Sequence, residues 1–213
     1  MRRIKAVPLL IAAAIAVGAL AVPAVASASF HWWKVGEGPI KGSETISLNG
    51  GSFQFLVLGA GGQLKCPTSG QATLAPNGKG ELTGFSFDAP KCETSGSTGV
   101  ANCLVSGSSS KTPFPMELKS TESVSISNFA FTLNFTQKPG KPKCNVTQLN
   151  IKATQGTTIT GVLGFNAGGF LESMKLTGLL EWSYGSIWVK SSEITATPLA
   201  VTPFLTYGTG ESP

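Results

Sequence analysis

The chain has 213 residues, with 16 lysines and arginines against 11 aspartates and glutamates and a formal net charge of +5. Three of the basic residues, Arg2, Arg3 and Lys5, lie at the extreme N-terminus, and no arginine follows residue 28. The remaining balance of 13 lysines against 11 acidic residues is +2, spread without a basic cluster. Nucleic-acid binding requires a concentrated basic surface, so this composition excludes that class of partner.

The first 28 residues have the pattern of a secretory signal peptide. The basic start is followed by an uncharged apolar run from Val7 to Val22, and Ala26-Ser27-Ala28 fits an A-x-A cleavage site. The run is shorter than the roughly 20 residues of a spanning helix. We therefore expect cleavage before Ser29, a secreted domain over residues 29–213, and no membrane span after processing. A retained signal anchor is the alternative.

All four cysteines, Cys66, Cys92, Cys103 and Cys144, follow the predicted cleavage site. An even number of cysteines in an oxidising compartment favours two disulfides. Three pairings are possible, and we prefer Cys66–Cys92 with Cys103–Cys144. The loop-entropy relation predicts that these two bonds stabilise the folded state by about 3.5 and about 4 kcal/mol. A zinc site is the competing interpretation, but it requires closely spaced ligands, and these cysteines are far apart.

The chain after residue 28 has the period-two pattern of strands and no sustained helical spacing. Phe53, Phe55 and Val57 recur at every second position, with Gln54 and Leu56 between them. Gly84 interrupts a strand through Leu82 and Phe87, and residues 129–135 form the clearest alternation. Val124 and Ile126 have the opposite parity to that run, which predicts a β-bulge near Ser127-Asn128. Later strands are expected at residues 145–153, 157–165, 174–184, 186–190 and 193–197.

Glycine-rich and asparagine-rich segments indicate the turns between these strands. We expect turns or loops at Asn49-Gly50-Gly51, 59–62, Asn77-Gly78 and 166–169, and mobile surface loops at 94–99 and 106–111. The sequence therefore predicts an all-β fold, a single antiparallel β-sandwich or jelly-roll-like domain of roughly ten short strands. Two small β-units are the alternative.

Three segments stand out around the cysteines: Leu64-Lys65-Cys66, then Gly80-Glu81-Leu82 leading to Lys91-Cys92, and later Cys144-Asn145-Val146 followed by residues 157–165. Together they resemble an uncharacterised paralogous group of small secreted actinobacterial β-proteins with two wide cysteine pairs. The resemblance covers most of the chain after residue 28 and implies a secreted or cell-surface setting. A fainter similarity is to the exported alkane-oxidation activator proteins, which also place a wide cysteine pair around a glycine-rich hairpin.

Catalytic patterns are weak in this sequence. The lone histidine, His31, lies close to the predicted mature N-terminus, and the lone aspartate, Asp88, precedes Ala89-Pro90 where a turn is expected. We interpret them as a terminal residue and a turn former. Ser110-Lys111 and Lys190-Ser191 are adjacent pairs, whose side chains point to opposite faces of a strand. We expect no catalytic residue, metal or cofactor.

Glycoside hydrolysis is the main enzymatic alternative, because it needs only two carboxylates across a cleft. The glutamates available in or near predicted strands are Glu81, Glu117, Glu172, Glu181 and Glu193. They form no closely spaced acidic motif, and glutamates on half-exposed strands normally face water.

Aromatic residues late in the chain supply the candidate ligand-binding positions, Trp182, Tyr184 and Trp188. Exposed aromatic rings bind sugar faces, whereas the alternative is that these rings fill the core and that Trp32-Trp33 anchors the N-terminal tail. We therefore expect a non-catalytic extracellular or cell-surface binding or structural protein, with wall glycan or another surface protein as partner. The rival classes are an extracellular glycan hydrolase and a membrane-acting or oligomeric β-protein.

Overall fold

A computed structural model describes residues 29–57, 62–96, 99–154, 158–168, 170–184, 187–191, 194–196 and 204–208 of the chain. In the described ranges the chain is almost entirely β-structure, with antiparallel pairing between the strands and two short 3-10 turns. The predicted all-β, sandwich-like antiparallel class is confirmed, and the strands are more numerous than the roughly ten expected.

The first half of the chain contains the following elements: β1 (Phe30–Lys34), β2 (Gly38–Pro39), β3 (Glu44–Val57), β4 (Gly62–Leu74), β5 (Lys79–Phe87), η1 (Ala89–Lys91), β6 (Glu93–Gly96), η2 (Gly99–Asn102) and β7 (Cys103–Ser110). The second half contains β8 (Phe114–Ser120), β9 (Ser123–Ile126), β10 (Ala130–Gln137), β11 (Gln148–Ala153), β12 (Ile159–Phe165), β13 (Leu171–Thr177), β14 (Leu180–Tyr184), β15 (Ile187–Ser191), β16 (Ile194–Ala196) and β17 (Phe204–Gly208).

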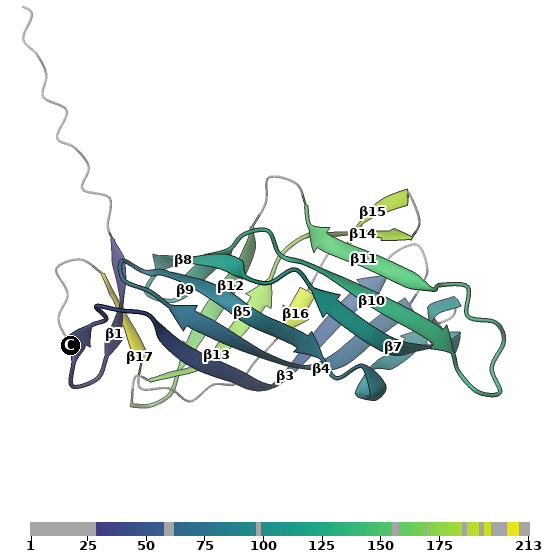
Figure 1. Cartoon of the computed structure of the whole chain (residues 1–213), viewed down its shortest axis with the longest axis horizontal. Coiled ribbons are helices and arrows are strands. Elements are labelled where there is room, and N and C mark those ends of the chain that lie inside the picture. The colour runs from purple at the N-terminus through teal and green to yellow at the C-terminus, as the bar shows by residue number, and fades with distance from the viewer. Residues whose placement is uncertain are drawn as a thin grey trace, which may run out of the picture.

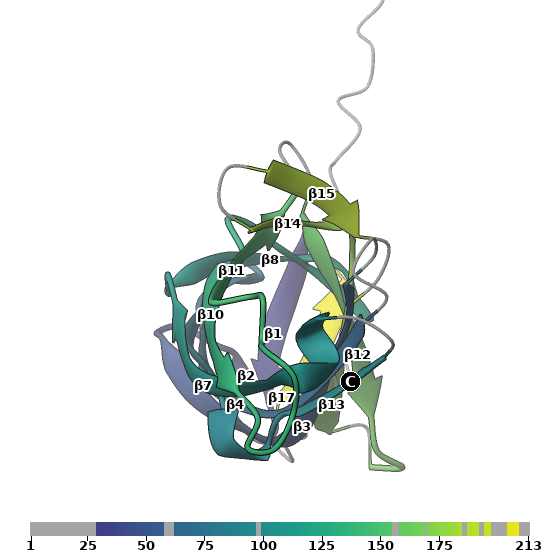
Figure 2. The ribbon, with the colours of Figure 1, turned by 90° about the vertical axis from the view of Figure 1, so that its right-hand side faces the viewer.

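A nine-stranded sheet with the order β3-β16-β13-β12-β9-β8-β5-β4-β6 forms the body of the molecule. It includes a curled half-barrel of seven strands, in which β3 also pairs along most of its length with β4. The short strand β16 bridges from β13 back to β3. Viewed along the long axis of the molecule, the strands curl around a common interior (Figure 2).

Two smaller sheets complete the fold. A five-stranded sheet with the order β15-β14-β11-β10-β7 closes over the interior, and β17-β1-β2 forms a three-stranded sheet. The strands β1 and β17 lie at one end of the elongated molecule, while β7 and the end of β10 lie at the other (Figure 1). The first and last described strands are therefore direct neighbours, paired in antiparallel fashion.

The core lies between the curled sheet and the five-stranded sheet, and phenylalanine rings dominate its centre. Phe53 of β3 meets Phe87 of β5 and Phe131 of β10 edge to face, with ring centroids 5.2 and 5.3 Å apart. Phe85 and Phe129 pack in the same cluster at 5.3 Å. Such edge-to-face pairs add to the free energy that burial of the rings provides. The predicted alternation through residues 129–135 is confirmed, because its four apolar side chains are buried.

The change of parity near Ser127-Asn128 has a different origin from the predicted bulge. Strand β9 pairs with β8 and β12 of the curled sheet, whereas β10 pairs with β7 and β11 of the other sheet. Asn128 lies between them with a φ of 58°, a left-handed conformation that asparagine tolerates better than most residues. The prediction of a bulge is therefore wrong: the chain crosses from one sheet to the other, and both sets of apolar residues face the shared interior.

Three further expectations from the sequence are corrected. The single strand predicted at residues 174–184 is two strands, β13 and β14, which belong to different sheets. The chain turns between them at Gly178, where a Cβ would lie 2.6 Å from the Cδ1 of Ile159. The segment 106–111, expected as a mobile loop, lies largely in β7, because Ser108, Ser109 and Ser110 pair with β10. Part of the other expected loop forms β6.

The disulfide pairing preferred from the sequence is confirmed. Cys66 in β4 bonds to Cys92 after η1, and Cys103 at the start of β7 bonds to Cys144 in the connection from β10 to β11. The predicted turn at Asn77-Gly78 is also confirmed, with both residues at positive φ. A Cβ on Gly78 would lie 2.3 Å from the carbonyl oxygen of Phe30, so glycine allows β1 to approach this turn.

Trp32 fills the end of the interior next to this turn. Its side chain is only 2% exposed and packs with the aliphatic residues of the curled sheet. This agrees with the interpretation of the segment as a buried anchor of the N-terminal tail. The described residues include no helix with the length and apolar character that crossing a membrane requires.

Candidate functional site

A polar groove of about 450 Å³ runs across β3, β4 and β5, where the end of β7 approaches the curled sheet. It is lined by Ser47, Asn49, Ser69, Gly70, Gln71, Gly84, Phe85, Ser86, Ser110 and Thr112. The lining therefore consists mainly of hydroxyl groups, side-chain amides and backbone, without a charged residue. The ring of Phe85 packs in the core cluster.

A β-bulge in β3 shapes one side of the groove. Leu48 pairs with Gly70 and Gly51 pairs with Thr68, so Asn49 and Gly50 together oppose the single residue Ser69. A bulge bends its strand and redirects the side chains beside it. The sequence prediction of a turn at Asn49-Gly50-Gly51 is thus wrong, since these glycines allow an irregularity within a long strand rather than its end.

A second bulge lies on the opposite side of β4, in β5. Gln71 pairs with Gly84 and Ala72 pairs with Leu82, which leaves Thr83 without an opposing residue. The hydroxyl of Thr83 donates to the carbonyl oxygen of Gln71 at 3.2 Å and holds the bulge against β4. The two bulges therefore flank the same short stretch of β4, and this pairing gives the sheet its local hollow.

Two glycines form the floor of the groove between the bulges. A Cβ on Gly70 would lie 2.4 Å from the carbonyl oxygen of Gly84, a distance that backbone atoms cannot accommodate. A Cβ on Gly84 would lie 3.4 Å from the backbone nitrogen of Gln71, which is ordinary contact. Gly70 is therefore required by the close approach of the two strands, whereas the position of Gly84 has room for a Cβ.

The polar side chains of the groove are held in part by one another. The hydroxyls of Ser69 and Ser86 lie 3.0 Å apart across β4 and β5. The hydroxyl of Ser110 donates to the carbonyl oxygen of Phe85 at 2.8 Å, which attaches the end of β7 to the edge of β5. The side-chain amides of Asn49 and Gln71 are exposed. Each amide offers donors and an acceptor to a ligand.

No carboxylate lines the groove, and several of those in the described ranges are paired with lysines. Glu117 pairs with Lys119, and Glu181 lies 3.8 Å from Lys152. A hydrogen bond from Lys119 lowers the pKa of Glu117, with a further contribution from its charge. No group of three or more histidine, cysteine, aspartate or glutamate side chains with the spacing of a metal site occurs in the part of the chain that the structure describes.

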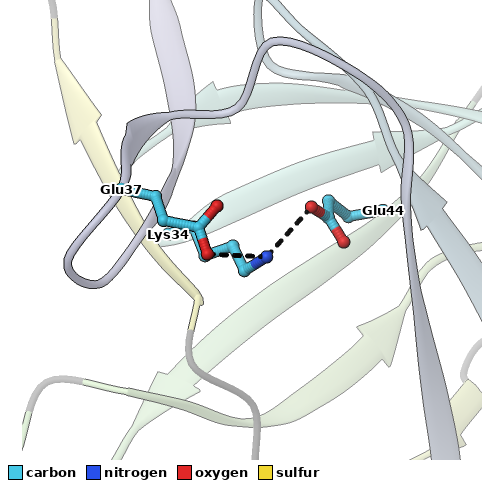
Figure 3. A network of polar contacts seen from close by, with 3 residues as sticks. All are labelled: Lys34, Glu37 and Glu44. Atoms are coloured by element: carbon cyan, nitrogen blue, oxygen red, sulfur yellow. Dashed lines mark hydrogen bonds and ion pairs between the residues drawn. The ribbon is translucent and has the colours of Figure 1, made fainter.

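The most developed charged network is at the other end of the molecule from β7. The ammonium group of Lys34 in β1 lies between two carboxylates, 3.0 Å from Glu37 and 3.2 Å from Glu44 (Figure 3). Hydrogen bonds with Glu37 and then with Glu44 raise the pKa of Lys34 above its ordinary value. These groups connect β1 to the start of β3, which is a structural role.

The interior contains two small voids, of about 20 and about 10 Å³. Trp32, Met116 and Met174 contribute to the larger void, whose walls are almost entirely apolar. Voids of this size hold at most about one water molecule. The groove is accordingly the described feature with the room and the polar groups to bind a larger molecule.

The aromatic positions proposed from the sequence are in β14 and β15, at some distance along the chain from the groove. In the backbone register Trp182 pairs with Ile151 and Val189, Tyr184 pairs with Ile187, and Trp188 pairs with Ser183. Trp188 therefore has the opposite strand parity to Trp182 and Tyr184. The side chains of these three residues lie outside the described part of the structure, and their role as a ligand platform stays a prediction.

The structure also places the residues whose catalytic roles were rejected from the sequence. His31 lies in strand β1 rather than in a mobile tail, 3.2 Å from the hydroxyl of Ser29. Asp88 lies in the turn before η1, as expected, and forms an ion pair of 2.7 Å with Lys91.

The groove itself was missed by the sequence interpretation. Asn49-Gly50-Gly51 was assigned to a turn, and Ser69, Gln71 and Ser86 are ordinary polar residues of strands. One signal could have located it, namely two glycine interruptions, at residues 50–51 and 84, in strands that are neighbours through β4. Comparisons with protein families, curated proteins and solved structures found no match to this chain.

Proposed function

We propose that this protein is a non-catalytic extracellular binding protein whose groove across β3, β4 and β5 holds an uncharged glycan. The observation that carries the proposal is the chemistry of the groove: its lining combines five hydroxyl-bearing residues and two side-chain amides with glycine backbone, and has no charge. Neutral sugars present many hydroxyls, each a donor and an acceptor, to which such groups are complementary.

The proposed location outside the cell follows from two independent features. The N-terminal 28 residues have the sequence pattern of a cleavable signal peptide, and the two disulfides are typical of proteins in oxidising compartments. We propose that the glycan belongs to a cell surface, with wall polysaccharide as the candidate partner.

Binding is favoured over hydrolysis because glycoside hydrolysis uses a pair of carboxylates that flank the scissile bond. The groove lining contains no aspartate or glutamate.

The test is co-sedimentation of the mature protein, from Ser29 onward, with isolated walls, with neutral polysaccharides, with anionic polysaccharides and with lipid vesicles. We expect pelleting with walls and with at least one neutral polysaccharide, unaffected by salt. Asn49→Ala and Gln71→Ala should each weaken binding about tenfold, as expected for loss of a buried hydrogen-bonding group in the complex. Thr160→Ala, an exposed threonine of β12 in the same sheet, is the matched control and should bind normally.

Other outcomes would contradict the proposal. Pelleting with vesicles alone would indicate a membrane-acting protein, and preference for anionic polysaccharides would indicate a charged surface outside the groove. Release of reducing ends from a polysaccharide during the incubation would indicate an enzyme.

A further inference from the structure

Polar side chains from three adjacent strands form a row across the groove. Ser47 of β3 pairs in register with Gln71 of β4, and Gln71 pairs with Gly84 of β5. One step along the strands, Ser69 of β4 pairs with Ser86 of β5. Because residues opposite each other in antiparallel strands share a face, these groups lie side by side on the outer face of the curled sheet.

The spacing of this row is set by the sheet itself. Neighbouring strands lie roughly 4.8 Å apart, which is close to the length of one sugar unit in an extended polysaccharide chain. A linear glycan that crosses the strands at right angles would therefore present successive sugar units to β3, β4 and β5 in turn. Along one strand, outward-facing residues recur only at every second position, about 6.6 Å apart, which is longer than one sugar unit and fits a glycan that runs parallel to the strands less well.

We infer that the groove contains three consecutive sugar subsites, one on each of β3, β4 and β5, and that its ligand is a linear, uncharged polysaccharide that crosses these strands. This inference rests on the proposed function and specifies the ligand's shape and minimum length. It follows from the register of the strands rather than from the chemistry of the lining alone.

The subsites on β3 and β4 have the same composition. Ser47 and Asn49 serve the first, and Ser69 and Gln71 serve the second. In each, a hydroxyl and an amide two residues apart lie on the same face of one strand. A side-chain amide can donate to one sugar hydroxyl and accept from its neighbour, and the serine completes the contact.

The third subsite differs because β5 contributes no side-chain amide and has Gly84 opposite the amide residue Gln71 of β4. Gly84 leaves room at this position, and the polar groups come from Ser86 and from Ser110 and Thr112 after the end of β7. The hydroxyl of Ser110 already donates to Phe85, so it meets a ligand as an acceptor. This subsite is closed on its far side by β7, which gives the bound chain a defined end.

The test is isothermal titration calorimetry, which measures the affinity of the mature protein for oligosaccharides of one to six units. The ligands are gluco-oligosaccharides of the cello, malto and laminari series and manno-oligosaccharides. In the series that binds, affinity should rise about tenfold with each unit up to three and then stay level, in line with one or two net hydrogen bonds per unit. Asn49→Ala should make the trisaccharide bind like the disaccharide while leaving the disaccharide's affinity unchanged. Thr160→Ala is again the control.

The outcomes separate this inference from the proposed function. A monosaccharide that binds as tightly as the hexasaccharide, or affinity that continues to rise to six units, would overturn the three-subsite arrangement while glycan binding stands. Failure of every oligosaccharide and of the neutral polysaccharides in co-sedimentation would remove both.

Discussion

The indole Nε1 of Trp32 donates to the backbone carbonyl oxygen of Lys79 at 2.9 Å. The same carbonyl accepts a hydrogen bond from the backbone nitrogen of Ala75 at 2.8 Å, which closes the turn between β4 and β5. The N-terminal strand is thus attached by a buried side chain to the hairpin that forms the groove's central strands. Stability of the N-terminal segment and stability of the curled sheet are therefore coupled.

Trp32 is accordingly expected to be a large contributor to stability. Trp32→Ala should lower the free energy of unfolding by about 3 to 5 kcal/mol, through lost burial and a cavity at the end of the interior. Trp32→Phe should cost less, because the Lys79 carbonyl keeps its bond from Ala75. Urea denaturation checks both, with the half-buried Trp33→Phe as comparison. A cost for Trp32→Ala no greater than that for Trp33→Phe would contradict the anchoring role.

The two glycines of the groove floor should respond oppositely to alanine. Gly70→Ala places a methyl group against the Gly84 carbonyl, and we expect a loss of stability of about 1 to 3 kcal/mol, as for other overpacked sites. Gly84→Ala meets only ordinary contacts and removes a flexible residue from a strand, so stability should be unchanged or slightly higher. The melting temperatures of the two variants in thermal unfolding test this difference. Equal destabilisation by both would contradict the close approach of the strands at Gly70 alone.

Two buried threonines form a second matched pair. The hydroxyl of Thr68 is buried, with a residue exposure of 5%, and makes no hydrogen bond within the described structure. The hydroxyl of Thr94 donates to the carbonyl of Cys103 at 2.6 Å. Thr68→Val should therefore be neutral or stabilising by about 1 kcal/mol, and Thr94→Val destabilising by a similar amount. If Thr68→Val destabilises as strongly, a water molecule bound by this hydroxyl is the simplest explanation.

The ion pairs of Lys34 predict a dependence of stability on alkaline pH. Glu37, then Glu44, raise the pKa of Lys34 from its ordinary value of 10.5, so the folded state holds this proton more tightly than the unfolded state. The stabilisation is fully present below the unfolded pKa and is lost as pH rises through the folded pKa. An NMR titration of the lysine side chain should show that Glu37→Gln lowers the pKa, whereas Glu122→Gln leaves it unchanged. An unaltered pKa in Glu37→Gln would contradict the pairing.

The sequence predicted correctly those features that depend on residues close to one another along the chain. Phe129, Phe131, Leu133 and Phe135 are buried as their spacing predicted, since a period of two places them on one face of a strand. The cysteine pairing that we preferred, one of the three that four cysteines allow, also agrees with the structure. These features depend on positions within a few tens of residues.

The groove depended on contacts that the sequence does not display. Glycines in a strand and glycines in a turn have the same local signature, and the difference at Asn49-Gly50-Gly51 is the long pairing of β3 with β4 on both sides of the bulge. Likewise, the parity change at Asn128 has two explanations, and the choice requires knowing which sheet each strand joins. Non-local pairing decides both.

The two disulfides follow one another along the chain without interleaving. Under the proposed export, a chain that enters an oxidising compartment N-terminus first can therefore close Cys66–Cys92 while the later cysteines are still arriving, because the correct partner is the next one to appear. An oxidase that joins cysteines in order of emergence is enough to produce the native pairs, and an isomerase that corrects wrong ones should be dispensable. The order of the cysteines along the chain is thus sufficient to determine which disulfides form.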